Sequence, residues 1–108
     1  MKISTENILY QITEKELQED VIELAKLLGW KGIYHTWRSD RSEPGYPDLT
    51  MFHPERKRII WVECKREHGK TTPSQVAYGE LIKASGGTYY LWYPHDWLDG
   101  AVERILKG

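Results

Sequence analysis

The sequence has little of three things: cysteine, long apolar runs and net charge. Its one cysteine, Cys64, excludes an intrachain disulfide and a cysteine-rich zinc site. No segment approaches the ~20 apolar residues that span a bilayer, and the N-terminus lacks the basic start and apolar run of a signal peptide. A cytoplasmic location is therefore expected, and the length of 108 residues predicts one domain, residues 1–108.

The small net charge hides an uneven distribution of charged residues. A net charge of −1 argues against a protein that binds nucleic acid through its overall charge. Residues 29–72, however, carry nine Lys or Arg against six Asp or Glu, a net +3, whereas residues 1–28 carry three against six, a net −3. A locally basic region suits a polyanionic substrate that meets one face of the protein. A solvated surface explains the same charges equally well.

Two apolar runs, residues 49–52 and 59–62, predict neighbouring strands in the middle of a sheet, covered on both faces. Pro47 has no backbone N–H to donate to a neighbouring strand, so it should be the first residue of its strand. This places Asp48 at the start of the first strand, where its side chain can take part in a site at the sheet edge.

The second of these strands ends in charged residues. Alternate side chains of a strand share a face, so Glu63 and Lys65 project the same way and Cys64 points opposite. In that position Cys64 is expected to be a small buried apolar residue rather than a nucleophile. If the two strands pair as a hairpin, Asp48 lies level with Glu63. Two carboxylates and an ammonium then converge, which suits a divalent metal with oxygen ligands and also permits a structural ion pair.

Helix signals flank these strands. A capping box at residues 13–16 and apolar residues at the helical period predict a helix that ends at Gly29. A second capping box at residues 72–75 opens a helix that stops at residues 86–87, with Val76, Leu81 and Ile82 as its apolar positions. The remaining expected segments are a lead-in at residues 1–12, as a short strand or an arm, strands at 32–37 and 88–93, a polar loop at 38–45 and a terminal helix at 96–106.

The predicted order of elements is helix, three strands, helix, strand, helix. The first three strands should form an antiparallel meander, and a crossover through the second helix should make the last two strands parallel. The expected fold class is α/β, with a mixed four-stranded sheet flanked by helices.

Several polar residues outside the strands are candidates for the same site. Glu14 and Gln18 fall on the flank of the buried stripe of the first helix, and Glu14 either complements the helix dipole or points to the site. Gln75 either caps its own helix or hydrogen-bonds a site carboxylate or a phosphate. Arg38 and Arg41, in the polar loop, are placed to meet phosphates, although a surface connection explains any one residue of that loop better.

These motifs, taken in order, resemble the VRR-NUC branch of the PD-(D/E)xK nucleases, in its stand-alone bacterial or phage type. Pro-Asp with Glu-x-Lys alone would be a weak signal, but five matches in order, from about residue 13 to 94, are strong. The matching segments are Thr-Glu-Lys-Glu-Leu-Gln at 13–18, Gly-Tyr-Pro-Asp-Leu at 45–49, Val-Glu-Cys-Lys at 62–65, Thr-Pro-Ser-Gln at 72–75 and Ser-Gly-Gly at 85–87.

The resemblance implies a restriction-endonuclease-like core and a Mg²⁺- or Mn²⁺-dependent endonuclease that hydrolyses DNA phosphodiesters, with branched or Holliday-junction DNA as its substrate. Asp48 and Glu63 match the metal-binding acids of the family, and Lys65 matches its motif lysine. Gln75 matches a recurrent glutamine, and the backbone carbonyl of Cys64 is implied as a further metal ligand. The resemblance also implies that the protein works in the cytoplasm of a bacterial cell or of a host cell infected by a phage.

One departure from the family concerns the first helix. Related junction resolvases carry a glutamate at the position of Gln18, and Glu14, one turn earlier on the same face, is the candidate replacement.

Symmetric cleavage of a four-way junction needs two active sites, so a homodimer is expected. A nucleic-acid-binding module without catalysis and a structural domain held by an ion-pair network remain as alternatives. The cations expected to contact DNA are Arg38, Arg41, Arg66 and Lys70.

Overall fold

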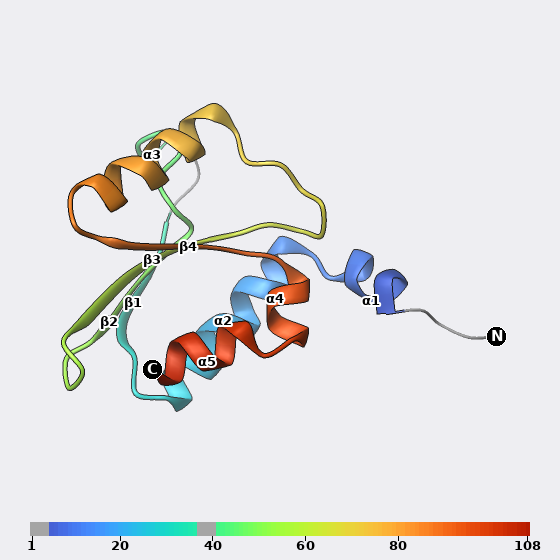
Figure 1. Cartoon of the computed structure of the whole chain (residues 1–108), viewed down its shortest axis with the longest axis horizontal. Helices are drawn as coiled ribbons and strands as arrows, with labels where there is room; N and C mark the ends of the chain where they lie inside the picture. The colour runs from blue at the N-terminus through green and yellow to red at the C-terminus, as the bar shows by residue number, and fades with distance from the viewer. Residues whose placement is uncertain (1–4, 37–40) are drawn as a thin grey trace.

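The computed structural model describes residues 5–36 and 41–108. In chain order the elements are α1 (Thr5–Gln11), α2 (Glu14–Leu27), β1 (Lys31–His35), β2 (Leu49–His53), β3 (Arg58–Cys64), α3 (Pro73–Ala84), β4 (Thr88–Trp92), α4 (Pro94–Leu98) and α5 (Ala101–Lys107). The strands form one sheet in the order β1-β2-β3-β4. Figure 1 shows α3 above this sheet, and α2, α4 and α5 below it.

The topology of the sheet confirms the predicted α/β fold. β1 and β3 both pair with β2 in antiparallel orientation, and β3 pairs with β4 in parallel orientation. Because Leu49 lies opposite Val62, the next residues outward, Asp48 and Glu63, lie level at the same end of the hairpin. Pro47 and Asp48 precede the first residue of β2, and Lys65 directly follows the last residue of β3.

The core lies on the side of the sheet that α2 and α5 cover. Side chains from the buried stripe of α2 pack here against alternate residues of β2 and β3, and Cys64 is fully buried among them, as predicted. The indole N–H of Trp30 donates to the carbonyl of Leu106 at 2.9 Å, and the guanidinium of Arg58 donates to the carbonyl of Ile105 at 2.7 Å. These bonds satisfy terminal carbonyls of α5, which no helical N–H can reach.

Two predicted elements are wrong. Residues 5–11 form the helix α1 rather than a strand or an arm, and Leu9 is its buried residue. The terminal helix predicted at 96–106 is two helices, and the first of them begins at Pro94. Gly100 has a φ of +84°, a left-handed conformation that ends α4 before α5 begins.

The prediction that the hairpin strands are covered on both faces is also wrong at one end. Phe52 and Ile59 are 40% and 47% exposed, and Val76 and Leu81 of α3 are more than half exposed. Of the apolar positions predicted for α3, only Ile82 is buried. The reason is that a single described helix, α3, covers this face of the sheet and leaves the turn end of the hairpin open (Figure 1). None of the helices in the described part of the chain is long and apolar enough to span a membrane.

Candidate active site

Two carboxylates meet where β2 begins and β3 ends. The Oδ2 of Asp48 accepts a hydrogen bond from the backbone N–H of Cys64 at 2.9 Å. Glu63 is 2% exposed, and its Oε2 accepts a hydrogen bond from Nε2 of Gln75 at 2.9 Å. Its other oxygen, Oε1, is buried and has no hydrogen-bond partner among the residues that the structure describes. Such an oxygen is uncommon in a folded protein and calls for a partner.

Burial changes the acidity of both groups. Burial, reinforced by the charge of Asp48, raises the pKa of Glu63 to about 8, and the nearby Lys65 opposes this rise. Burial also raises the pKa of Asp48, against the lowering effect of its hydrogen bonds to the Cys64 backbone and the Gln18 side chain. A cation held between the two carboxylates would favour their charged forms and lower both pKa values.

Lys65 links the carboxylate pair to α2. Its Nζ lies 3.9 Å from Oε2 of Glu63 and 3.8 Å from Oε1 of Glu14, and its side chain is 12% exposed. Glu14 lies in the first turn of α2, whose capping box between Thr13 and Glu16 is present as predicted. Glu14 therefore points to the site, and its position in the first helical turn also complements the helix dipole.

Gln75 makes two contacts that the sequence offered as alternatives, a cap on its own helix and a hydrogen bond to a site carboxylate. Its Oε1 accepts a hydrogen bond from the backbone N–H of Thr72 at 2.8 Å, which completes the second capping box. Its Nε2 donates to Glu63. An amide side chain has an acceptor and a donor end, so one glutamine caps α3 and holds the site carboxylate at once.

Comparison with solved structures places this architecture in a known family. A structure described as "VRR_NUC domain" superposes with a TM-score of 0.69 and 27% identity, over 83% of this chain and 94% of that one. The chain therefore folds as a VRR_NUC domain. A second structure, described as "VRR_NUC domain protein", matches with a TM-score of 0.63 and 23% identity, over 86% of this chain and 84% of that one. No protein-family model and no curated protein matches the sequence.

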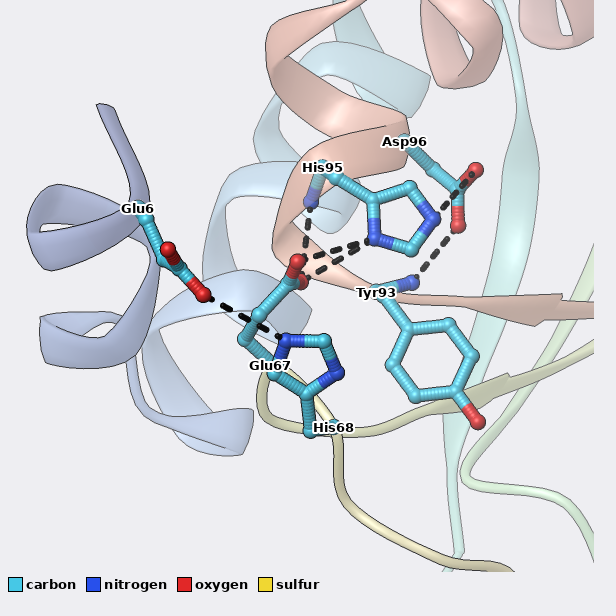
Figure 2. A network of polar contacts seen from close by, with 6 residues as sticks. All are labelled: Glu6, Glu67, His68, Tyr93, His95 and Asp96. Carbon is cyan, nitrogen blue, oxygen red and sulfur yellow. Dashed lines mark hydrogen bonds and ion pairs between the residues drawn. The ribbon is translucent and has the colours of Figure 1, made fainter. Parts of the chain in front are cut away.

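The segment that follows β3 in this VRR_NUC domain is anchored by a buried acid that the sequence did not single out. Glu67 accepts a hydrogen bond from the backbone N–H of His95 at 3.3 Å, and both of its oxygens lie 3.1 Å from Nδ1 of that histidine (Figure 2). His68, the next residue, reaches α1, with Nε2 4.0 Å from Oε1 of Glu6. In the sequence Arg66-Glu67-His68 nothing distinguishes Glu67 from a surface acid.

Three of the four cations expected to contact DNA are exposed in the VRR_NUC domain. Arg66 and Lys70 are exposed on the segment that follows the carboxylate pair, and Arg41 is exposed before β2. Arg38 lies outside the described residues.

The acids of the VRR_NUC domain fit a hard divalent cation, although as a pair rather than a larger cluster. Within residues 5–36 and 41–108, no group of three or more His, Cys, Asp and Glu side chains is arranged to hold a metal ion. Glu14, the predicted third acid, contacts Lys65 instead. Asp48 and Glu63 nevertheless offer hard oxygen donors, and the buried Oε1 of Glu63 lacks a partner.

Proposed function

We propose that this VRR_NUC domain is a divalent-metal-dependent DNA endonuclease that hydrolyses phosphodiester bonds, with Mg²⁺ or Mn²⁺ as its cofactor. The observation that carries the proposal is the unsatisfied, buried Oε1 of Glu63 beside the partly buried carboxylate of Asp48. Burial of such a group in its charged form is costly unless a cation offsets the charge, and without a cation the group keeps its proton. The likeness to structures described as VRR_NUC domains supports the nuclease assignment.

The ion would be held by Asp48 and Glu63 with the backbone carbonyl of Cys64. Glu14 and Gln18, on the α2 side of the pair, are candidates to complete its ligand set. When bound, the ion supplies a water of lowered pKa and positive charge beside the phosphate oxygens. Oxygen donors of this kind favour Mg²⁺ or Mn²⁺ over zinc.

Lys65 and Gln75 would act beside the ion. Lys65 carries its ammonium between two carboxylates, where it can orient the attacking water and stabilise the negative charge of the transition state. By analogy with oxyanion-hole donors, this contribution is about 3 kcal/mol. Gln75 binds one oxygen of Glu63 and so leaves the other oxygen for the ion.

Branched DNA, including four-way junctions, is the proposed substrate, and a homodimer is the proposed active form. One site cuts one strand, so two sites related by a two-fold axis would cut a junction symmetrically. Arg41, Arg66 and Lys70 would contact phosphates, which position DNA without reading its sequence. Arg38 is proposed for the same role on the basis of its place in the sequence.

The decisive experiment incubates the protein with single-stranded, duplex, flap and four-way-junction DNA in Mn²⁺. We expect cleavage that EDTA and Asp48→Asn abolish and that Lys65→Ala reduces about 100-fold. Full metal-dependent cleavage by Lys65→Ala would rule out the role of that lysine.

The presence of the neutral Gln18 at the carboxylate pair favours one second candidate, a catalytically inactive nucleic-acid-binding module. DNA binding that persists in EDTA, with no cleavage in Mg²⁺ or Mn²⁺, would establish it. If removal of charge at the site raises stability and DNA binding is absent, the residues form a structural ion-pair network.

A further inference from the structure

Asp48 lies just outside the ladder that fixes the position of Glu63. The last paired residues of β2 and β3 are Leu49 and Val62, so the ladder stops one residue short of Asp48. When both carboxylates are charged they repel each other, and this repulsion favours any movement that separates them. The position of Asp48 therefore depends on its own hydrogen bond with the Cys64 backbone and on the segment that precedes it, residues 45–47.

Gly45 places this segment against the first turn of α3. Its φ of +83° lies in the left-handed region, and a Cβ here would lie 2.3 Å from the carbonyl carbon and oxygen of Ser74 and 2.8 Å from the backbone nitrogen of Gln75. Glycine alone allows so close an approach of two backbones. The segment therefore touches the peptide that carries Gln75, the donor to Glu63.

Tyr46 joins three elements at one point. Its phenolic oxygen accepts a hydrogen bond from Nε1 of Trp61 at 2.9 Å and lies 3.5 Å from Oγ1 of Thr50. Its ring packs edge-on against Tyr78 of α3, with ring centroids 5.3 Å apart. Trp61 and Glu63 are alternate residues of β3 and share a face of the sheet. Tyr46 is therefore bonded to the strand face that carries Glu63.

The other side of the segment is held by Thr36. Its Oγ1 donates to the carbonyl of Pro47, and its backbone N–H donates to the carbonyl of Asp48 at 2.8 Å. The side chain of Pro47 is fully buried. The Thr36 contacts hold the segment to the residue that follows β1. The hydrogen bond between Tyr46 and Trp61, by contrast, ties the segment to β3, the strand that carries Glu63.

We propose that Tyr46 is a positioning residue that fixes Asp48 relative to Glu63. The inference rests on the proposed function, because it gives Tyr46 a part in assembling the metal-binding pair. A merely structural role would change the stability of the fold and leave the geometry of the carboxylates as it is. Trp61 should share the effect, since the two side chains act through one hydrogen bond.

Tyr46→Phe tests the proposal, because it keeps the ring and removes the hydroxyl. Tyr90→Phe, on the opposite face of the sheet, is the matched control. The first readout, in metal-free protein, is hydrogen exchange of the Cys64 amide, which donates to Asp48. Relative to the amide of Ile60 in the same strand, Tyr46→Phe should speed this exchange about five-fold and the control should leave it unchanged.

Binding of Mn²⁺, followed through the paramagnetic resonance of the free ion, is the second readout. Tyr46→Phe should weaken Mn²⁺ binding about five-fold. Trp61→Phe should weaken it by a similar factor, with no further loss in the double variant. If Tyr46→Phe keeps the wild-type values of both the Cys64 exchange rate and the Mn²⁺ affinity, the proposal is overturned. If the wild-type protein binds no Mn²⁺ and cuts no DNA, the proposed function fails, while exchange at Cys64 still decides the role of Tyr46.

Discussion

Glu63 combines two properties that rarely occur together in a carboxylate: near-complete burial and an oxygen without a hydrogen-bond donor in the described part of the chain. Because its pKa is raised to about 8, mainly by burial, the metal-free side chain is largely protonated at neutral pH. A cation must displace that proton in order to bind. We therefore expect the affinity for Mn²⁺ or Mg²⁺ to rise as the pH approaches 8.

At the same residue, Glu63→Gln should stabilise the metal-free protein at pH 8 and change its stability little at pH 4. The pKa of Glu63 rises from its ordinary value of 4.5 to about 8 on folding. As the pH increases between these values, the unfolded chain releases the proton first, so the wild type loses stability. Glutamine has no charge to bury, and the gain at pH 8 should be on the order of a few kcal/mol.

Urea unfolding in EDTA at pH 4 and pH 8 measures this difference. Glu55→Gln, an exposed acid in the turn between β2 and β3, is the matched control and should change neither free energy of unfolding. Added Mn²⁺ should stabilise the wild type and not Glu63→Gln, because a ligand stabilises the state that binds it. Equal stability of wild type and Glu63→Gln at pH 8 would contradict the raised pKa.

At the scale of elements, those whose signals are local could be predicted from the sequence. The capping threonines Thr13 and Thr72 accept hydrogen bonds from backbone N–H groups three residues on, at 3.0 and 3.2 Å. The two-residue period of a strand likewise predicted that Glu63 and Lys65 share a face. Pairing of the two strands as a hairpin predicted that Asp48 lies level with Glu63. Their convergence is therefore readable from the sequence, whereas their catalytic roles stay predictions.

Elements that depend on distant contacts could not be predicted in the same way. α1 contacts the segment after β3 through the rings of Tyr10 and His68, which are 58 positions apart in the sequence. The start of α4 at Pro94 escaped prediction for a local reason instead: Asp96 accepts a hydrogen bond from the backbone of Tyr93, a cap that a search for serine or threonine overlooks. The contacts of Tyr46 also escape sequence reasoning, because its partners come from three separate elements.

The turn before β2 gives a prediction at this scale. Gly45→Ala should destabilise the protein more than Gly86→Ala, although both glycines have a positive φ, of +83° and +87°. A Cβ at Gly86 meets nothing within 4 Å, so alanine there costs about 1 kcal/mol for its conformation alone. At Gly45 the Cβ would also collide with the backbone of Ser74. Thermal unfolding measures both effects, and equal losses would show that the turn can move away from α3.

On the scale of the whole molecule, the two faces of the sheet differ in how they are covered. One face carries the core under α2 and α5, while the other carries α3 (Figure 1). Phe52 and Ile59 alternate with core residues of their strands and are exposed on this second face. A cavity of about 610 Å³ lies on this second face, lined in part by Ile59, Trp61 and Leu81. Exposed apolar side chains and a hollow lined in part by apolar residues thus occur on one face, which suits a two-fold contact between identical copies.

The proposed homodimer is therefore expected to use this face. Light scattering should give the mass of a dimer for the wild type and of a monomer for Leu81→Glu, because the new charge would be buried without a partner at the contact. Leu27→Glu is the matched control, since Leu27 is a 78% exposed leucine at the end of α2, on the other side of the sheet, and should leave the dimer intact. Leu81→Glu should also lose paired cuts across a four-way junction and keep single-strand nicking. A monomeric wild type at working concentration would contradict the dimer and leave a nicking or flap-cutting enzyme.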